Sequence, residues 1–219
     1  MRVDELFTDE IIDEDIRKWA AGAMAGAALM AHPGANGVEH TNGRQVVQHM
    51  EEEKTKEAIL AQTMWGEARD HGVEGMRAIG HVVLNRTAAN HPGMFGKNVI
   101  DVATKSKQFS CWNPGDPNRK AIADMKQIDA ALKMHKSPVA GKSFEEWAKA
   151  FKLSDAFPEY QRWNEAKALA KEILQGHSTD PTKGALFYHT THVHPSWDRK
   201  LDRIGKVGGH IFYKIANRN

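Results

Sequence analysis

Apolar residues recur at helical spacing along most of the chain. Between residues 57 and 69, Ile59, Leu60, Thr63 and Met64 fall on one face of a helix, at about 100° per residue. The same spacing, with capping and stop signals, predicts further helices over 74–89, 118–135, 143–153 and 158–176. Helices therefore dominate the predicted fold.

Two stretches near the end of the sequence favour β-structure. Residues 184–189 are strand-like, and the alternation of Ile211, Tyr213 and Ile215 indicates a closing strand. Residues 108–112, QFSCW, combine aromatic and small side chains, which suits a strand or a loop lining a groove. The predicted fold class is mainly α (α+β), with a small β element that lines a cleft.

The first 50 residues differ from the rest. Residues 1–31 hold an acidic stretch, a basic pair and the apolar run 19–31, which is short for a bilayer span. This pattern fits either an export signal or anchor, or an N-terminal helical extension that packs on another subunit or a virion protein. Residues 32–50 contain Pro and Gly and predict a linker, so we expect the catalytic domain at 51–219.

Composition narrows the function classes. The 219 residues are 41% hydrophobic, enough for one sizeable core, and the net charge of +2 gives no broad electrostatic footprint for nucleic acid. Cys111 is the single cysteine, which excludes an intramolecular disulfide and zinc sites built on paired cysteines. Between aromatic neighbours, Cys111 is expected to be a packed apolar side chain rather than a nucleophile.

A carboxylate, Glu67, projects from the apolar face of the helix predicted over 57–69. A carboxylate on a core-facing stripe needs a hydrogen-bonded partner or a raised pKa, and a raised pKa is what a general acid requires near neutral pH. The alternative is a structural ion pair with Arg69, Arg77 or Arg86. Periodicity alone leaves both interpretations open.

Six segments occur in the order and approximate spacing of a known family: GEAR at 66–69, VEGMRAIGHVVLNR at 73–86, QFSCW at 108–112, GALFYH at 184–189, PSW at 195–197 and IGKVGGHIFYK at 204–214. Across residues 57–214 the chain resembles the SleB-like cell-wall hydrolases, which include spore-cortex-lytic enzymes and phage proteins. The resemblance implies a lysozyme-like fold, cleavage of peptidoglycan glycan strands, and Glu67 as the catalytic residue.

Five other residues are candidates for binding the sugar. Gln108 and Ser110 are expected to hydrogen-bond an N-acetyl sugar near Glu67, and Trp112 to stack on a sugar ring, with ordinary core packing as its alternative. Tyr188 matches a position that the family keeps aromatic on the cleft side. His189 is expected to hydrogen-bond sugar or backbone.

His189, His192 and His194 also invite a metal interpretation. No HExxH accompanies them, and the resemblance implies no catalytic metal. We therefore expect no metal and no cofactor.

The number of catalytic carboxylates decides the mechanism. Two carboxylates flanking the bond would indicate hydrolysis. Asp70 and Glu74 are candidates for the second carboxylate, and both are weaker candidates than Glu67. Glu74 has structural alternatives as a charge at a helix start or a partner of Arg77. With one carboxylate, Glu67 can act first as acid and then as base, which is lytic transglycosylase chemistry and is what the resemblance favours.

The expected partner is the peptidoglycan glycan strand, with membrane or virion-protein contact through residues 1–31. We expect action at the cell wall or periplasm by a phage endolysin or virion-associated hydrolase, made in the host cytoplasm and then exported or delivered in a virion. Two alternatives are a non-catalytic peptidoglycan-binding or virion structural protein, and a metal-dependent amidase that uses the late histidines.

Overall fold

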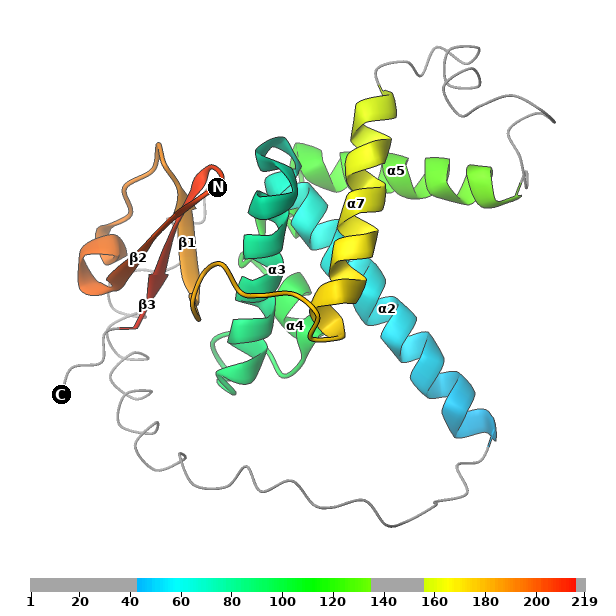
Figure 1. Cartoon of the computed structure of the whole chain (residues 1–219), viewed down its shortest axis with the longest axis horizontal. Helices are drawn as coiled ribbons and strands as arrows, with labels where there is room; N and C mark the ends of the chain where they lie inside the picture. Colours follow the sequence, from blue (N-terminus) through cyan, green and yellow to red (C-terminus); the bar gives the residue numbers. More distant parts are fainter. Residues whose placement is uncertain (1–42, 135–155, 216–219) are drawn as a thin grey trace.

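The computed structural model describes residues 43–134 and 156–215 (Figure 1). In these ranges five α-helices surround the core: α2 (Gly43–Ala68), α3 (Gly72–Ala88), α4 (Val99–Thr104), α5 (Pro117–Met134) and α7 (Ala156–Leu174). There are also three short 3-10 helices in these ranges, η2 (Arg69–His71), η3 (Ser110–Trp112) and η4 (Ser196–Lys200). The prediction of a mainly helical fold with a small sheet is confirmed.

Helix α2 is longer than the sequence pattern predicted. Residues 43–50, assigned above to a linker, form its first turns, and residues 48–50 are exposed. The last of the Pro and Gly signals is Gly43, the first residue of the helix, and Lys56 pairs with Glu52 at 3.2 Å and Glu53 at 2.9 Å on the helix surface. In Figure 1 this end of α2 extends away from the other helices, so helix propensity rather than burial accounts for it.

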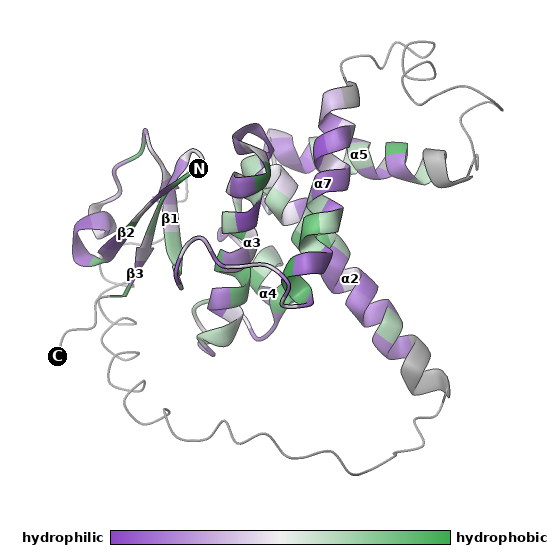
Figure 2. Ribbon diagram, viewed as in Figure 1, coloured by the Kyte–Doolittle hydropathy of each residue, from purple (hydrophilic) through white to green (hydrophobic). Residues whose placement is uncertain are grey.

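The core lies where α2, α3 and α7 pack together. Trp65 and Trp163 meet edge to face, with ring centroids 5.4 Å apart. Gly80 permits the close approach, because a Cβ there would lie 2.5 Å from the sulfur of Met64 and 2.6 Å from Ile173. Figure 2 shows apolar residues gathered where these helices meet. The apolar stripes found by periodicity are thus the faces that the helices bury.

The sheet is antiparallel, in the order β1-β3-β2, and lies beside α3 (Figure 1). Its strands are β1 (Phe187–Thr190), β2 (Asp202–Val207) and β3 (His210–Lys214). Tyr188 pairs with Phe212 in the β1–β3 register. The predicted closing strand at 211–215 corresponds to β3, and QFSCW forms a loop that ends in η3 rather than a strand.

In the described ranges no helix has the length and apolarity that a membrane crossing requires. The predictions for residues 1–31 and for a helix over 143–153 fall outside the described residues.

Candidate active site

Glu67 occupies the last turn of α2, one turn after Thr63 on the same face. The neighbouring Gly66 lets η3 lie directly on the helix. A Cβ at Gly66 would lie 2.6 Å from the Cβ of Cys111 and 2.9 Å from the Cδ1 of Ile122, so these neighbours would have to shift. Sequence reasoning missed this role, because nothing in the pattern said which segment would pack there.

Three hydrogen-bond donors surround the carboxyl group of Glu67. Its Oε1 accepts from the hydroxyl of Ser110 at 3.1 Å and from the backbone N–H of Cys111 at 2.8 Å. Its Oε2 accepts from the hydroxyl of Tyr188 at 3.1 Å. The residue stays partly exposed, whereas Tyr188 is buried. The structure thus brings Ser110 and Tyr188, two of the predicted site residues, to the predicted acid.

Burial raises the pKa of Glu67 above its ordinary value, and the hydrogen bonds from Cys111, Tyr188 and Ser110 oppose that rise without cancelling it. Burial, together with the charge of Glu67, also raises the pKa of Tyr188, so its hydroxyl keeps its proton. The same two causes raise the pKa of the buried Cys111 thiol, which matches its predicted role as a packed side chain.

None of the three nearby arginines pairs with Glu67. Arg69 lies 2.9 Å from Glu159, and Arg77 lies 3.3 Å from the carboxylate of Glu74. Arg86 donates to the carbonyl of Leu186 at 2.8 Å and to Gln108 Oε1 at 2.9 Å. The structural ion-pair interpretation of Glu67 is therefore wrong.

Gln108 faces the protein interior. It is 5% exposed; its Oε1 accepts from Arg86 and its Nε2 donates to the carbonyl of Met94. Both ends of the amide are used in joining the 108–112 segment to α3 and to the loop before α4. This placement contradicts the expected sugar contact, because the amide has no exposed group to offer.

His189 points to the opposite side of β1 from Tyr188, as neighbouring residues in a strand do. Its Nδ1–H donates to the carbonyl of Thr190 at 2.8 Å, which leaves Nε2 to accept from the Tyr213 hydroxyl at 2.8 Å. His189 is buried, so of the two expected partners the structure supports backbone rather than sugar.

His192 and His194 are exposed, and the rings of His189 and His194 are 6.4 Å apart. Over residues 43–134 and 156–215, no group of three or more His, Cys, Asp or Glu side chains is arranged to hold a metal ion.

Asp70 and Glu74, the candidates for a second carboxylate, are both exposed. Asp70 lies in η2, and Glu74 opens α3 in contact with Arg77. Neither belongs to the hydrogen-bonded group around Glu67. The contact of Glu74 with Arg77 agrees with the structural alternative named for it.

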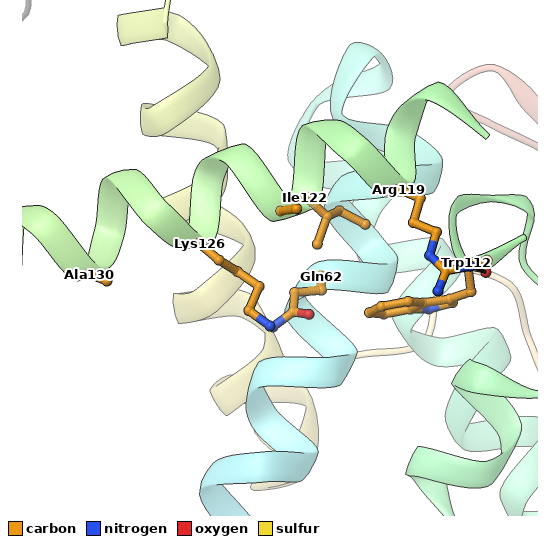
Figure 3. Close-up of a pocket in the computed structure, with 7 residues that line it drawn as sticks. Gln62, Trp112, Arg119, Ile122, Lys126 and Ala130 are labelled. Carbon is orange, nitrogen blue, oxygen red and sulfur yellow. Dashed lines mark hydrogen bonds between the residues drawn. The ribbon is translucent and has the colours of Figure 1, made fainter. Parts of the chain in front are cut away.

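Trp112 is half-buried at the end of η3, and its Nε1 donates to Thr63 Oγ1 at 3.0 Å. It lines a pocket of about 460 Å³ between α2 and α5 (Figure 3). The indole packs partly on the core and partly faces this pocket, so it is available for stacking.

Comparisons with known proteins agree with the motifs. A family model described as cell wall hydrolase matches residues 70–213, a range that begins just after Glu67. No curated protein gives a significant match.

Two solved structures are similar to the chain. The catalytic domain of the germination-specific lytic transglycosylase SleB from Bacillus anthracis is 22% identical, with 73% of this chain and 93% of that chain covered and a TM-score of 0.43. The catalytic domain of the Bacillus cereus SleB protein is 19% identical, with 86% and 100% covered and a TM-score of 0.45. Because the family model matches more than half of the chain, the chain belongs to the cell wall hydrolase family and is a cell-wall-degrading enzyme.

Proposed function

We propose that the chain cleaves the β-1,4 bond between N-acetylmuramic acid and N-acetylglucosamine as a lytic transglycosylase, with Glu67 as acid and then base. One observation carries the proposal: Glu67 is partly exposed, its pKa is raised, and its carboxyl group is held by neutral donors without a cation. A carboxyl group in that state can hold a proton near neutral pH and deliver it.

The donors indicate which oxygen carries the proton. Oε1 accepts from the Cys111 backbone N–H, which can only donate, and from Ser110 as well. Oε2 faces the Tyr188 hydroxyl, which can rotate to accept when Oε2 is protonated. In the acid form the proton therefore resides on Oε2, and from there it passes to the glycosidic oxygen as the bond to C1 breaks.

The ionised carboxylate left by the first step then acts as base. It accepts the proton of the 6-hydroxyl on the muramic sugar while that oxygen bonds to C1, which closes a 1,6-anhydro ring without consuming water. Ser110, Cys111 and Tyr188 all donate to the carboxylate during this interval, which stabilises its charge. One carboxyl group thus serves both steps.

The decisive experiment is Glu67→Gln in a turbidity assay on purified sacculi. The amide keeps an acceptor for Ser110 and Cys111 but cannot give up a proton as an acid does, so we expect at least about a 100-fold loss of lysis with the fold retained. Glu74→Gln is the matched control, because Glu74 is exposed and contacts Arg77, and its activity should stay near wild type. Lysis at wild-type rate by Glu67→Gln would contradict the assignment.

Product masses separate the two glycosidase mechanisms. A transglycosylase releases anhydro-muropeptides, each one water lighter than the product of a hydrolase. Hydrolytic masses from an enzyme that still requires Glu67 would replace the transglycosylase mechanism by hydrolysis and would keep the acid assignment.

For the biological setting we infer a phage endolysin or a virion-associated hydrolase, exported or delivered to the wall. The inference rests on the acidic stretch and apolar run within residues 1–31. A chain that begins at Gly43, where α2 starts, should retain activity on isolated sacculi but lose delivery to the periplasm of intact cells. Equal delivery of the full chain and of the chain that begins at Gly43 would contradict a targeting role for residues 1–31.

A further inference from the structure

The pocket between α2 and α5 adjoins the site of Glu67. Its lining includes Gln62, Trp112, Arg119, Ile122, Lys126 and Ala130, and Figure 3 shows side chains of both helices and of η3 directed into it. Gln62 lies one helical turn before Gly66, the residue against which Ile122 packs beside Glu67. The same 3-10 turn, η3, supplies Trp112 to the pocket and Ser110 and Cys111 to the carboxyl group of Glu67, so the pocket lies next to the proposed acid.

One wall of the pocket is an aromatic surface held in a fixed orientation. Trp112 Nε1 donates to Thr63 Oγ1 at 3.0 Å, and the Thr63 hydroxyl donates in turn to the Ile59 carbonyl at 2.8 Å. With Ile122 beside it, the indole presents an apolar surface suited to a saccharide ring.

Two cationic side chains, Arg119 and Lys126, also line the pocket, and the lining has no acidic residue. Arg119 donates to the Trp112 carbonyl at 3.2 Å, and neither side chain forms an ion pair with another described residue. Elsewhere on α5, Lys120 pairs with Asp124 at 2.7 Å. Positive charge without a carboxylate partner is therefore concentrated at the pocket.

Gln62 adds a polar group to the lining. The residue is 7% exposed overall and lines the pocket. A side-chain amide can both donate a hydrogen bond to an occupant and accept one from it.

We propose that this pocket is a subsite for a sugar residue that carries a carboxylate, and this proposal rests on the function proposed above. Trp112 stacks on the ring, Gln62 bonds an amide or hydroxyl group of the sugar, and Arg119 and Lys126 bind the carboxylate. Peptidoglycan offers that carboxylate in two places, on the lactyl ether of muramic acid and on the stem peptide. The subsite thus distinguishes peptidoglycan from neutral N-acetylglucosamine polymers.

The test is equilibrium binding by the full chain carrying Glu67→Gln, so that ligands are not cleaved. Three ligands are compared: peptide-bearing glycan strands, strands freed of peptide by an amidase so that each lactyl group ends in a carboxylate, and chitin oligosaccharides of equal length. We expect at least one carboxylate-bearing ligand to bind roughly tenfold more tightly than chitin, with a preference that declines as salt is raised. A preference for amidase-treated strands identifies the lactyl group, and one confined to peptide-bearing strands identifies the stem.

Adding Arg119→Gln and Lys126→Gln should reduce the affinity for carboxylate-bearing strands to that for chitin, while Lys120→Gln, on the same helix but outside the pocket, leaves it unchanged. Equal binding of chitin and peptidoglycan strands, or a preference that survives the double substitution, would overturn the proposal. Because the binding assay needs no turnover, it is independent of whether Glu67 is the acid. If Glu67→Gln abolishes lysis but the double variant binds carboxylate-bearing strands as tightly as before, the subsite proposal is refuted and the assignment of Glu67 as acid is kept.

Discussion

Arg86 and Glu67 are charged residues of neighbouring helices, and they differ in exposure and in their hydrogen-bond partners. Arg86 is 3% exposed, donates to Leu186 and Gln108, and its guanidinium lies 5.4 and 5.0 Å from the rings of Phe95 and Phe109. Glu67 is partly exposed and is bonded only by neutral donors. The enclosed Arg86 therefore keeps its position and its charge, whereas the partly exposed Glu67 can exchange a proton.

Burial shifts the pKa values of the two residues in opposite directions. Burial lowers the pKa of Arg86 to about 10, so it remains charged at neutral pH. Burial raises the pKa of Glu67, which brings its proton exchange closer to neutrality. Desolvation acts on both residues, but only the pKa of the carboxyl group moves towards the range that the proposed general acid needs. Substitutions at and around the two residues test this division between structure and chemistry.

The largest effect on stability is expected from Arg86→Met. The substitution keeps much of the side-chain volume but leaves the carbonyl of Leu186 and Oε1 of Gln108 without a donor, at a cost of about 3 kcal/mol or more. Urea denaturation measures the loss. Arg162→Met, in the half-exposed pair with Glu165, is the control and should change stability by less than about 0.5 kcal/mol. Similar losses in the two variants would show that Arg86 is not the structural charge we describe.

Gly66→Ala should cost about 1–3 kcal/mol, because the added methyl group must displace Cys111 or Ile122. Since Cys111 and Ser110 hold Glu67, we expect lysis to fall together with stability. Denaturation and turbidity assays on the same preparation measure both. Gly205→Ala in β2, where the new Cβ meets nothing within 4 Å, is the control. Full activity of Gly66→Ala would separate the position of η3 from catalysis.

A smaller effect is the pH dependence of stability. Because the folded-state pKa of Glu67 is raised above its ordinary value of 4.5, the folded protein retains a proton that the unfolded chain releases. Wild-type stability therefore falls as pH rises from about 4.5 through the folded-state pKa. The Glu67→Gln variant lacks this loss, so its melting temperature should exceed that of wild type at pH 8 and converge with it near pH 4. Parallel melting curves across that range would contradict a raised pKa.

The smallest effect is expected from Tyr188→Phe. Its hydroxyl donates to Glu67 and lowers the pKa of the carboxyl group, so removing it should raise that pKa further. The decline of kcat/KM at alkaline pH, where the acid loses its proton, should move to higher pH. Tyr213→Phe is the control, since that hydroxyl bonds His189. Coincident pH profiles for the two variants would exclude Tyr188 from control of the acid.

Local patterns predicted the helices well, and contacts between distant segments were harder to predict. The stripes of α3, α5 and α7 were predicted within about two residues, because apolar periodicity and the stop at Gly176 are properties of neighbouring residues. Glu67 was found the same way. The first turns of α2 were missed, because exposed helix without an apolar stripe resembles a linker.

Side-chain direction depended on tertiary contacts. Tyr188 and His189 were both assigned to the sugar, yet strand alternation sends only Tyr188 to Glu67. Gln108 was assigned with Ser110, but a loop lacks the regular period that would have shown the two pointing apart. Family motifs located the segment, and only the packing of Arg86 explains why its glutamine turns inward.

The 3-10 turn η3 touches α2 at two points on the same helix face. Ser110 and Cys111 hold the carboxyl group of Glu67, and Trp112 is hydrogen-bonded to Thr63 one turn earlier. The indole and the carboxyl group are thereby linked through one turn of the chain. On the proposed function, a sugar stacked on Trp112 is held in register with Glu67, so little orientational freedom is left to lose when the bond is cleaved.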